Sequence, residues 1–311
     1  MQGLQKLDGK RRGYFSLLIT STVWGTTWVV SKIGVNEIPA LQMAYIRQLI
    51  AGSCFVLFFM FYKKFSLPTA KQFKWIAVMS VLMFVFANGL STWSLKYIPT
   101  GLSALIGALY PLSVVVIERI FFKSTNMTIL TFLGLFLGIT GIGIVFYENA
   151  FHNSSSSFGF GVGLSVVAML SWSFGTIFIA RNKANINPYY GTGWQMLISS
   201  VILLIMAETT QPTVHLNEIS LKVWIVILYL VFFGSILSFV AFIYSMKKLP
   251  TAVASLYAYI NPLVAMVAAT FVLDEKLTLN ILWGAIVTLL GVYLVNYSIK
   301  KNTRVIVEAE I

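Results

Sequence analysis

The stretch WSLKYIPT at residues 93–100 returns 151 positions later as YSMKKLPT at residues 244–251. Prolines and glycines further along the chain repeat at the same distance or at one residue less. These pairs are Pro111 and Pro262, Gly134 and Gly284, and Gly141 and Gly291. The spacing therefore predicts that the chain consists of two related halves.

The composition indicates a lipid environment. Hydrophobic residues make up 58% of the 311 residues, charged residues make up 10%, and the mean hydropathy is +0.84, which leaves too little polar surface to cover a water-soluble globule. Continuous apolar runs of about 20 residues, without period-2 alternation, predict an all-α multi-pass membrane protein with ten transmembrane helices. The runs cover residues 13–35, 40–62, 73–95, 100–122, 127–147, 159–181, 190–208, 221–246, 250–273 and 278–298.

The net charge of +12 is distributed unevenly over the segments between these runs. If the N-terminus is cytoplasmic, sixteen Lys and Arg side chains lie inside and only four lie outside. This asymmetry follows the positive-inside rule, so it predicts that both termini are cytoplasmic and gives no indication of nucleic-acid binding.

Because each half contributes five spans, the second half must enter the membrane from the opposite side. We therefore expect two inverted five-helix repeats at residues 13–147 and 159–298, joined by the polar linker HNSSSS at 152–157. Residues 1–12 and 299–311 are the expected cytoplasmic tails. Inverted repeats in membrane proteins typically enclose a substrate path at their interface.

The halves resemble the EamA repeats of the drug/metabolite transporter superfamily over residues 14–298. The features that carry the resemblance are WGTTW at 24–28, Pro-Thr at 99–100 and 250–251, Tyr-Pro at 110–111, Asn-Pro at 261–262, and DEKLT at 274–278 followed by Gly284 and Gly291. The first half departs from the family with Lys-Ser-Thr at 123–125, where a Glu-Arg turn is common. The resemblance implies a carrier of the bacterial inner membrane that exports amino acids or other small metabolites.

Arg47 is the strongest single candidate for substrate binding. It follows Pro39 by eight residues, which places it roughly 12 Å into the membrane. A charge at that depth is costly unless it faces a watery cavity or a partner. Arg47 is expected either to bind a substrate carboxylate or phosphate, or to have a structural role, such as pairing with Glu37.

Two further charged residues are candidates for charge recognition or coupling. Lys32 lies nearer the outer surface, where it would either extend its amine to the interface or attract an anion. Glu118 would suit proton coupling if it were buried, but it lies close to Lys123 at the inner boundary, which favours an interfacial position.

Pro111 and Pro262 are expected to kink their helices at equivalent places, because each removes a backbone hydrogen bond. Polar and aromatic side chains near these kinks or deep in other spans are candidates for the cavity lining, although packing alone would also explain them. The candidates are Trp24, Asn88, Tyr110, Trp172, Gln195, Tyr257, Tyr259 and Asn261.

Gly134 and Gly138 form a GxxxG motif, which allows close helix contact within the chain or between two copies. A homodimer is therefore one alternative. The lone Cys54 excludes an intramolecular disulfide, and both histidines fall in loops. No metal site or other cofactor is predicted, and the chain contains no enzyme motif such as HExxH or a phosphate loop.

The sequence therefore predicts a secondary transporter for a small-molecule substrate within the lipid bilayer. The basic residue in the expected cavity favours substrates that bear a carboxylate or phosphate. A channel and a non-transporting membrane sensor of small metabolites are the alternatives.

Overall fold

The computed structural model describes the backbone of residues 2–122, 127–152, 157–181, 185–249, 253 and 256–309. Side chains are described from Gly9 to Ser298 within these ranges, except for residues 149–152. The predicted linker, the 123–125 turn and Pro250 therefore lie partly or wholly outside the described residues.

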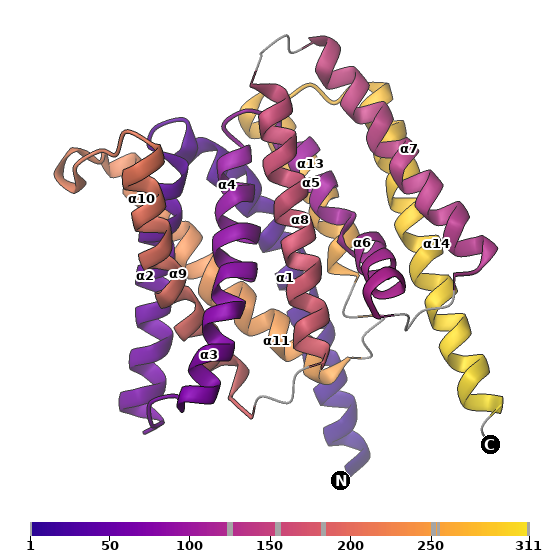
Figure 1. Cartoon of the computed structure of the whole chain (residues 1–311), viewed down its shortest axis with the longest axis horizontal. Coiled ribbons are helices and arrows are strands. Elements are labelled where there is room, and N and C mark those ends of the chain that lie inside the picture. Colours follow the sequence, from indigo (N-terminus) through magenta and orange to yellow (C-terminus); the bar gives the residue numbers. More distant parts are fainter. Residues whose placement is uncertain are drawn as a thin grey trace.

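Every regular element in the described ranges is a helix, as predicted (Figure 1). The first half contains α1 (Gln2–Val35), α2 (Ala40–Leu57), η1 (Phe58–Tyr62), α3 (Ala70–Met79), η2 (Ser80–Leu90), α4 (Ser91–Ser94), α5 (Thr100–Ala108), α6 (Tyr110–Ile117), η3 (Glu118–Phe122) and α7 (Ile129–His152). The second half contains α8 (Phe158–Arg181), α9 (Pro188–Thr210), η4 (Leu216–Glu218), α10 (Leu221–Tyr229), η5 (Leu230–Leu237), α11 (Ser238–Lys248), α13 (Tyr257–Leu273) and α14 (Leu279–Ala309).

Eight of the described helical segments are long and apolar enough to cross a membrane, and α13 is a shorter apolar helix. The one remaining predicted span, residues 13–35, lies in α1, which is richer in hydroxyl side chains. These hydroxyls donate to carbonyl oxygens one turn earlier in the same helix, as Thr20 does to Ser16, Ser21 to Leu17 and Thr27 to Trp24. Because their donors are satisfied internally, the hydroxyls are compatible with the interior of a bilayer. The prediction of an all-α multi-pass membrane protein is confirmed.

The contact between α7 and α14 shows that the second half is inverted. A Cβ atom added at Gly134 would lie within 3.0 Å of the Gly291 carbonyl oxygen, and one added at Gly284 within 3.0 Å of the Gly141 carbonyl oxygen. Gly134, the earlier glycine of α7, therefore meets Gly291, the later glycine of α14, and Gly141 meets Gly284. The two helices are therefore antiparallel. Since Gly134 matches Gly284 and Gly141 matches Gly291, exchanging the halves reproduces the same contacts.

The remaining helices follow the same exchange. α1 packs against α13 and α11 of the second half, and α8 packs in the corresponding way against α5, α6 and η2 of the first. α2 packs against α9, its own counterpart. α1 begins and α14 ends on the same side of the bundle, as an even number of crossings requires (Figure 1).

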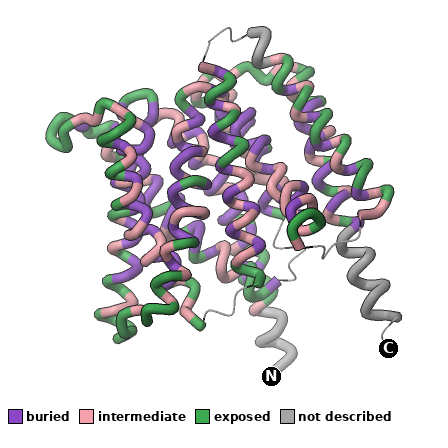
Figure 2. The backbone as a smooth tube through the Cα atoms, in the orientation of Figure 1, coloured by how far each residue is buried: buried purple, intermediate pink, exposed green. Residues whose placement is uncertain are grey.

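The helices near the centre of the bundle are buried more deeply than α7 and α14. In the most apolar stretch of each span, 67% of the residues are buried in the span that combines α5 and α6, but only 28% in α7 and 33% in α14 (Figure 2). The α7–α14 pair therefore lies at the edge of the bundle. The close glycine contact that the sequence left open is formed within the chain.

The connection between α4 and α5 is held by two opposite charges, one from each half. The Lys32 Nζ atom donates to the carbonyl oxygens of Leu95 and Ile98, the latter at 3.2 Å. The Glu275 carboxylate accepts from the backbone N–H groups of Thr100 at 2.8 Å and Gly101 at 3.3 Å. Both charges complement the helix ends that they contact, because helix N-termini attract anions and C-termini attract cations.

Replacing Glu275 with glutamine is expected to lower the free energy of unfolding by about 1 kcal/mol, because a neutral amide gives up charge-assisted bonds to the first turn of α5. Thermal unfolding of the detergent-solubilised protein measures this effect. Lys276→Gln, which changes the exposed neighbour, is the matched control. Equal unfolding temperatures for the two variants would contradict a capping role for Glu275.

A candidate substrate cavity between the two halves

A cavity of about 170 Å³ lies where the two halves meet. Its wall combines side chains of α1, α2, η2, α5 and α6 from the first half with side chains of α8, α11 and α13 from the second. Most of the residues predicted for the site contribute to it. These are Trp24, Arg47, Asn88, Tyr110, Trp172, Tyr257, Asn261 and Pro262.

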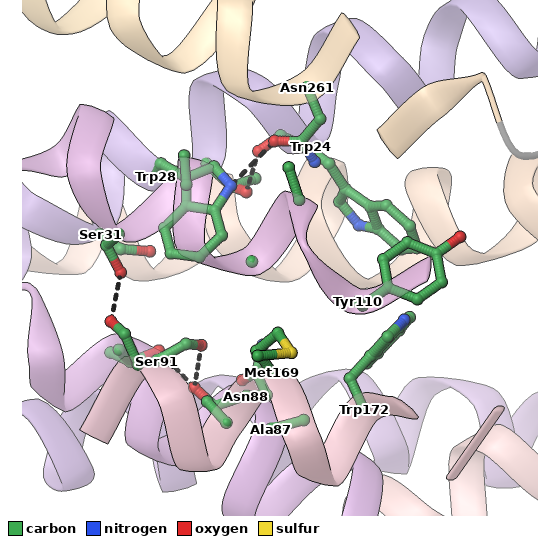
Figure 3. A pocket seen from close by; sticks show the side chains of 18 of the residues that line it. Trp24, Trp28, Ser31, Ala87, Asn88, Ser91, Tyr110, Met169, Trp172 and Asn261 are labelled. Carbon is green, nitrogen blue, oxygen red and sulfur yellow. Dashed lines mark hydrogen bonds between the residues drawn. The ribbon is translucent and has the colours of Figure 1, made fainter. Parts of the chain in front are cut away.

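Aromatic rings form one side of this cavity. The Trp24 ring lies edge-on to the rings of Trp172 and Tyr257, with centroid distances of 6.2 and 5.5 Å. The Tyr257 ring in turn stacks on that of Tyr110 at 6.1 Å. Figure 3 shows Trp24, Tyr110 and Trp172 gathered on the same side. Such a wall offers large apolar faces with polar edges to a flat or apolar ligand.

The two tryptophans of WGTTW are fixed by the second half. The Trp24 Nε1 atom donates to the Gly234 carbonyl oxygen at 3.0 Å, within the π-helical segment η5. The Trp28 Nε1 atom donates to Asn261 Oδ1 at 2.9 Å. Both indoles lie on one face of α1 because residues four apart in a helix are neighbours.

Arg47 is buried, with 6% of its surface exposed, and it lines the cavity. Its Nε atom donates to Ser235 Oγ of η5 at 2.8 Å. Glu37, the structural partner considered from the sequence, instead pairs with Lys222 at 2.7 Å. No carboxylate in the described part of the chain lies within ion-pairing distance of Arg47. The guanidinium therefore presents positive charge to the cavity.

Asn88 belongs to the π-helical segment η2 and contacts an amide network that the sequence did not reveal. The Gln48 Nε2 atom donates to Asn88 Oδ1 at 3.1 Å and to the Phe84 carbonyl oxygen at 3.2 Å. Ser199 of α9 donates its hydroxyl proton to Gln48 Oε1. Gln48 thus joins three helical segments directly beside the cavity.

The two proline positions differ in their local structure. The helix stops at Leu109, one residue after α5, and begins again as α6 with Pro111 in its first turn. Pro262 lies inside the continuous helix α13 and lines the cavity, whereas Pro111 is buried outside it. Both prolines leave a carbonyl oxygen four residues earlier without its helical donor, namely those of Gly107 and Ala258. Both of these residues line the cavity.

Besides Pro111, four other predicted residues lie away from this cavity. Tyr259 points toward α14, where its hydroxyl group bonds to Asn296 and to the Val292 carbonyl oxygen. Gln195 of α9 and Lys32 are not part of the cavity wall. Glu118 pairs with Arg181 at 3.2 Å near the ends of η3 and α8, and both side chains are partly exposed. Their assignment to recognition or coupling remains a prediction.

Sequence reasoning missed Trp28, Gln48 and Ser235. The i, i+4 spacing of the tryptophans in WGTTW would have placed Trp28 beside Trp24. Gln48 directly follows Arg47, but nothing in the sequence indicates that it reaches η2 and α9. Ser235 is one of many serines in apolar runs, so only its position beside Arg47 distinguishes it.

A bundle of inverted helical halves with a partly polar cavity at their interface is typical of membrane transporters. Residues 11–147 and 159–297 match the EamA-like transporter family. The chain therefore belongs to this family.

The most similar relatives include proteins with transporter names. The chain is 30% identical over 265 residues to the uncharacterized inner membrane transporter YedA of Escherichia coli (strain K12), covering 85% of this chain and 83% of YedA. It is 24% identical over 291 residues to the uncharacterized transporter YoaV of Bacillus subtilis (strain 168), covering 92% and 97% of the two chains. A crystal structure with 13% sequence identity covers 94% of this chain and 99% of its own chain at a TM-score of 0.64, which shows a shared fold.

Proposed function

We propose that the protein is a secondary transporter that exports amino acids or related small metabolites from the cytoplasm by alternating access. The observation that carries the proposal is the cavity between the inverted halves, which brings a buried Arg47 together with an aromatic wall. The family and the transporter names of its relatives support the same class of activity. We place the helices in the inner membrane, because the similar protein YedA is named an inner membrane transporter. We place both termini in the cytoplasm on the basis of the positive-inside charge distribution.

The proposed cycle uses the near-equivalence of the halves. If the two halves exchange conformations, the cavity opens alternately to each side of the membrane. A substrate drives this exchange only if its affinity differs between the two conformations. The break before Pro111 and the proline within α13 are placed where such bending would change the cavity wall.

Counterflow in proteoliposomes tests the proposal. Purified protein is reconstituted into vesicles loaded with one unlabelled compound, and uptake of the same labelled compound is followed for amino acids, nucleosides and organic acids. A carrier gives transient, saturable accumulation of one chemical class. Labelled flux without counterflow or saturation would replace the proposal with a channel. Ligand binding without any flux would replace it with a sensor.

A further inference from the structure

The direction of the hydrogen bonds beside the cavity determines the polarity that its amide side chains present. An asparagine offers either an acceptor oxygen or a donor NH₂ group, depending on which of them its neighbours occupy. Both asparagines of the cavity wall, Asn88 and Asn261, receive a hydrogen bond at Oδ1. Their NH₂ groups are therefore the ones left to face the cavity.

Gln48 fixes the orientation of Asn88. Its Nε2 atom lies 3.2 Å from the Phe84 carbonyl oxygen, which can only accept a proton. Its Oε1 atom takes the proton of the Ser199 hydroxyl group. Gln48 is therefore held with its NH₂ group toward Asn88, and Asn88 accepts this hydrogen bond through its Oδ1 atom.

Trp28 fixes the orientation of Asn261. An indole N–H group is a donor and never an acceptor, so the atom that receives it at 2.9 Å is the Asn261 oxygen. In Figure 3 this pair lies across the cavity from Asn88. NH₂ groups consequently approach the cavity from two sides, one from each half of the chain.

The charge on the cavity wall also favours an anionic ligand. Arg47 donates only through Nε to Ser235, and the described residues provide no hydrogen-bond partner for its two terminal nitrogens. No aspartate or glutamate is among the described residues that line the cavity. The amide groups left for a ligand are thus donors, and the one formal charge among the described residues that line the cavity is positive.

We propose that the cavity selects organic anions, with Arg47, Asn88 and Asn261 binding the oxyanion, and that Gln48 and Trp28 are positioning residues that set this selectivity. The inference deepens the proposed function and rests on it for its physiological meaning. The body of the anion would lie against the aromatic wall of Trp24, Trp172 and Tyr257, which accepts apolar or flat groups. A cation of the same shape would be repelled by Arg47, whose positive charge has no countercharge among the described residues.

Direct binding of ligands that share a ring and differ in charge tests the selectivity. Calorimetry on the purified, detergent-solubilised protein compares phenylacetate, phenylalanine and phenethylamine. We expect phenylacetate to bind at least about tenfold more tightly than phenethylamine, with phenylalanine between them. Tighter binding of the amine, or no detectable binding of phenylacetate, would overturn the proposal.

Two isosteric variants separate polarity from folding. Asn88→Asp and Asn261→Asp keep the oxygen that Gln48 or Trp28 contacts, but each replaces the NH₂ group with a second oxygen. Each is expected to weaken phenylacetate binding by about tenfold or more, because a negative charge then faces the anion. Unchanged phenylacetate affinity in both variants would overturn the assignment of these side chains.

Trp28→Phe tests the positioning role. This variant keeps an aromatic ring but removes the donor, so Asn261 is free to turn its oxygen toward the cavity. The preference for phenylacetate over phenethylamine is expected to fall by about fivefold, whereas Trp283→Phe, on the exposed face of α14, leaves it unchanged. An unaltered preference in Trp28→Phe contradicts the positioning role. Because binding is measured without flux, a failure of counterflow would refute the proposed transport separately.

Discussion

Arg47→Ala is expected to reduce counterflow by at least about 100-fold while the protein still inserts into the membrane. A hydrogen bond to a charged group contributes about 1.5–3 kcal/mol, and the upper end of that range corresponds to roughly this loss. Arg47 is the buried cation of the cavity wall, and its positive charge has no countercharge among the described residues. Removing it leaves an anionic ligand without its principal attraction. Initial rates of labelled uptake in proteoliposomes measure the effect.

Two control variants show whether the effect depends on the site. Arg119→Ala removes an exposed arginine of η3 and is expected to retain normal flux. Arg47→Lys keeps the charge but loses the planar fork of donors, so it should fall between the wild type and Arg47→Ala. Normal uptake by Arg47→Ala, with the amount of reconstituted protein matched, would exclude Arg47 from substrate recognition.

The sequence was sufficient to predict the helical membrane fold because the signal is distributed over whole segments. Each span needs about 20 apolar residues, and a single substitution changes this pattern little. The inversion followed from the odd number of spans in each half, and the structure confirms it through the antiparallel contact of Gly134 with Gly291. These features depend on length, composition and repetition, which a sequence states directly.

The cavity was predictable only in part, because its chemistry depends on where side chains point. Trp24 and Asn261 were candidates since polar groups deep in a membrane need partners. Their partners come from distant segments, such as Gly234 for Trp24, and no local pattern identifies them. Gln195 and Tyr259 are also polar or aromatic side chains within apolar spans, as the cavity residues are, but they lie outside the cavity wall.

The π-helical segments are another feature that the apolar pattern did not predict. η2 and η5 occupy comparable positions in the third span of each half. Both contribute to the site, η2 through Asn88 and η5 through Gly234 and Ser235. A π-helical turn changes which residues face a neighbouring helix, so it alters the cavity lining without changing the length or hydropathy of the span.

Gly141→Ala is expected to lower the free energy of unfolding by about 3 kcal/mol, at the upper end of the usual cost of overpacking. The added Cβ atom would lie closer than 3.0 Å to the Thr288 nitrogen and the Gly284 carbonyl oxygen. Both are backbone atoms, so a side-chain rotation cannot relieve the clash and α7 must move away from α14. Because this pair lies at the edge of the bundle, we expect the loss to appear as a lower unfolding temperature and a smaller yield of monodisperse protein.

Gly143→Ala is the matched control, since it makes the same change two residues later in the same helix. A Cβ atom at Gly143 would meet nothing within 4 Å. Alanine favours a helix over glycine by about 1 kcal/mol, so this variant should be as stable as the wild type or slightly more stable. The difference between the two variants therefore isolates the α7–α14 contact from helix propensity. If both variants unfold at the same temperature, the close glycine contact is not what holds the fifth span to the tenth.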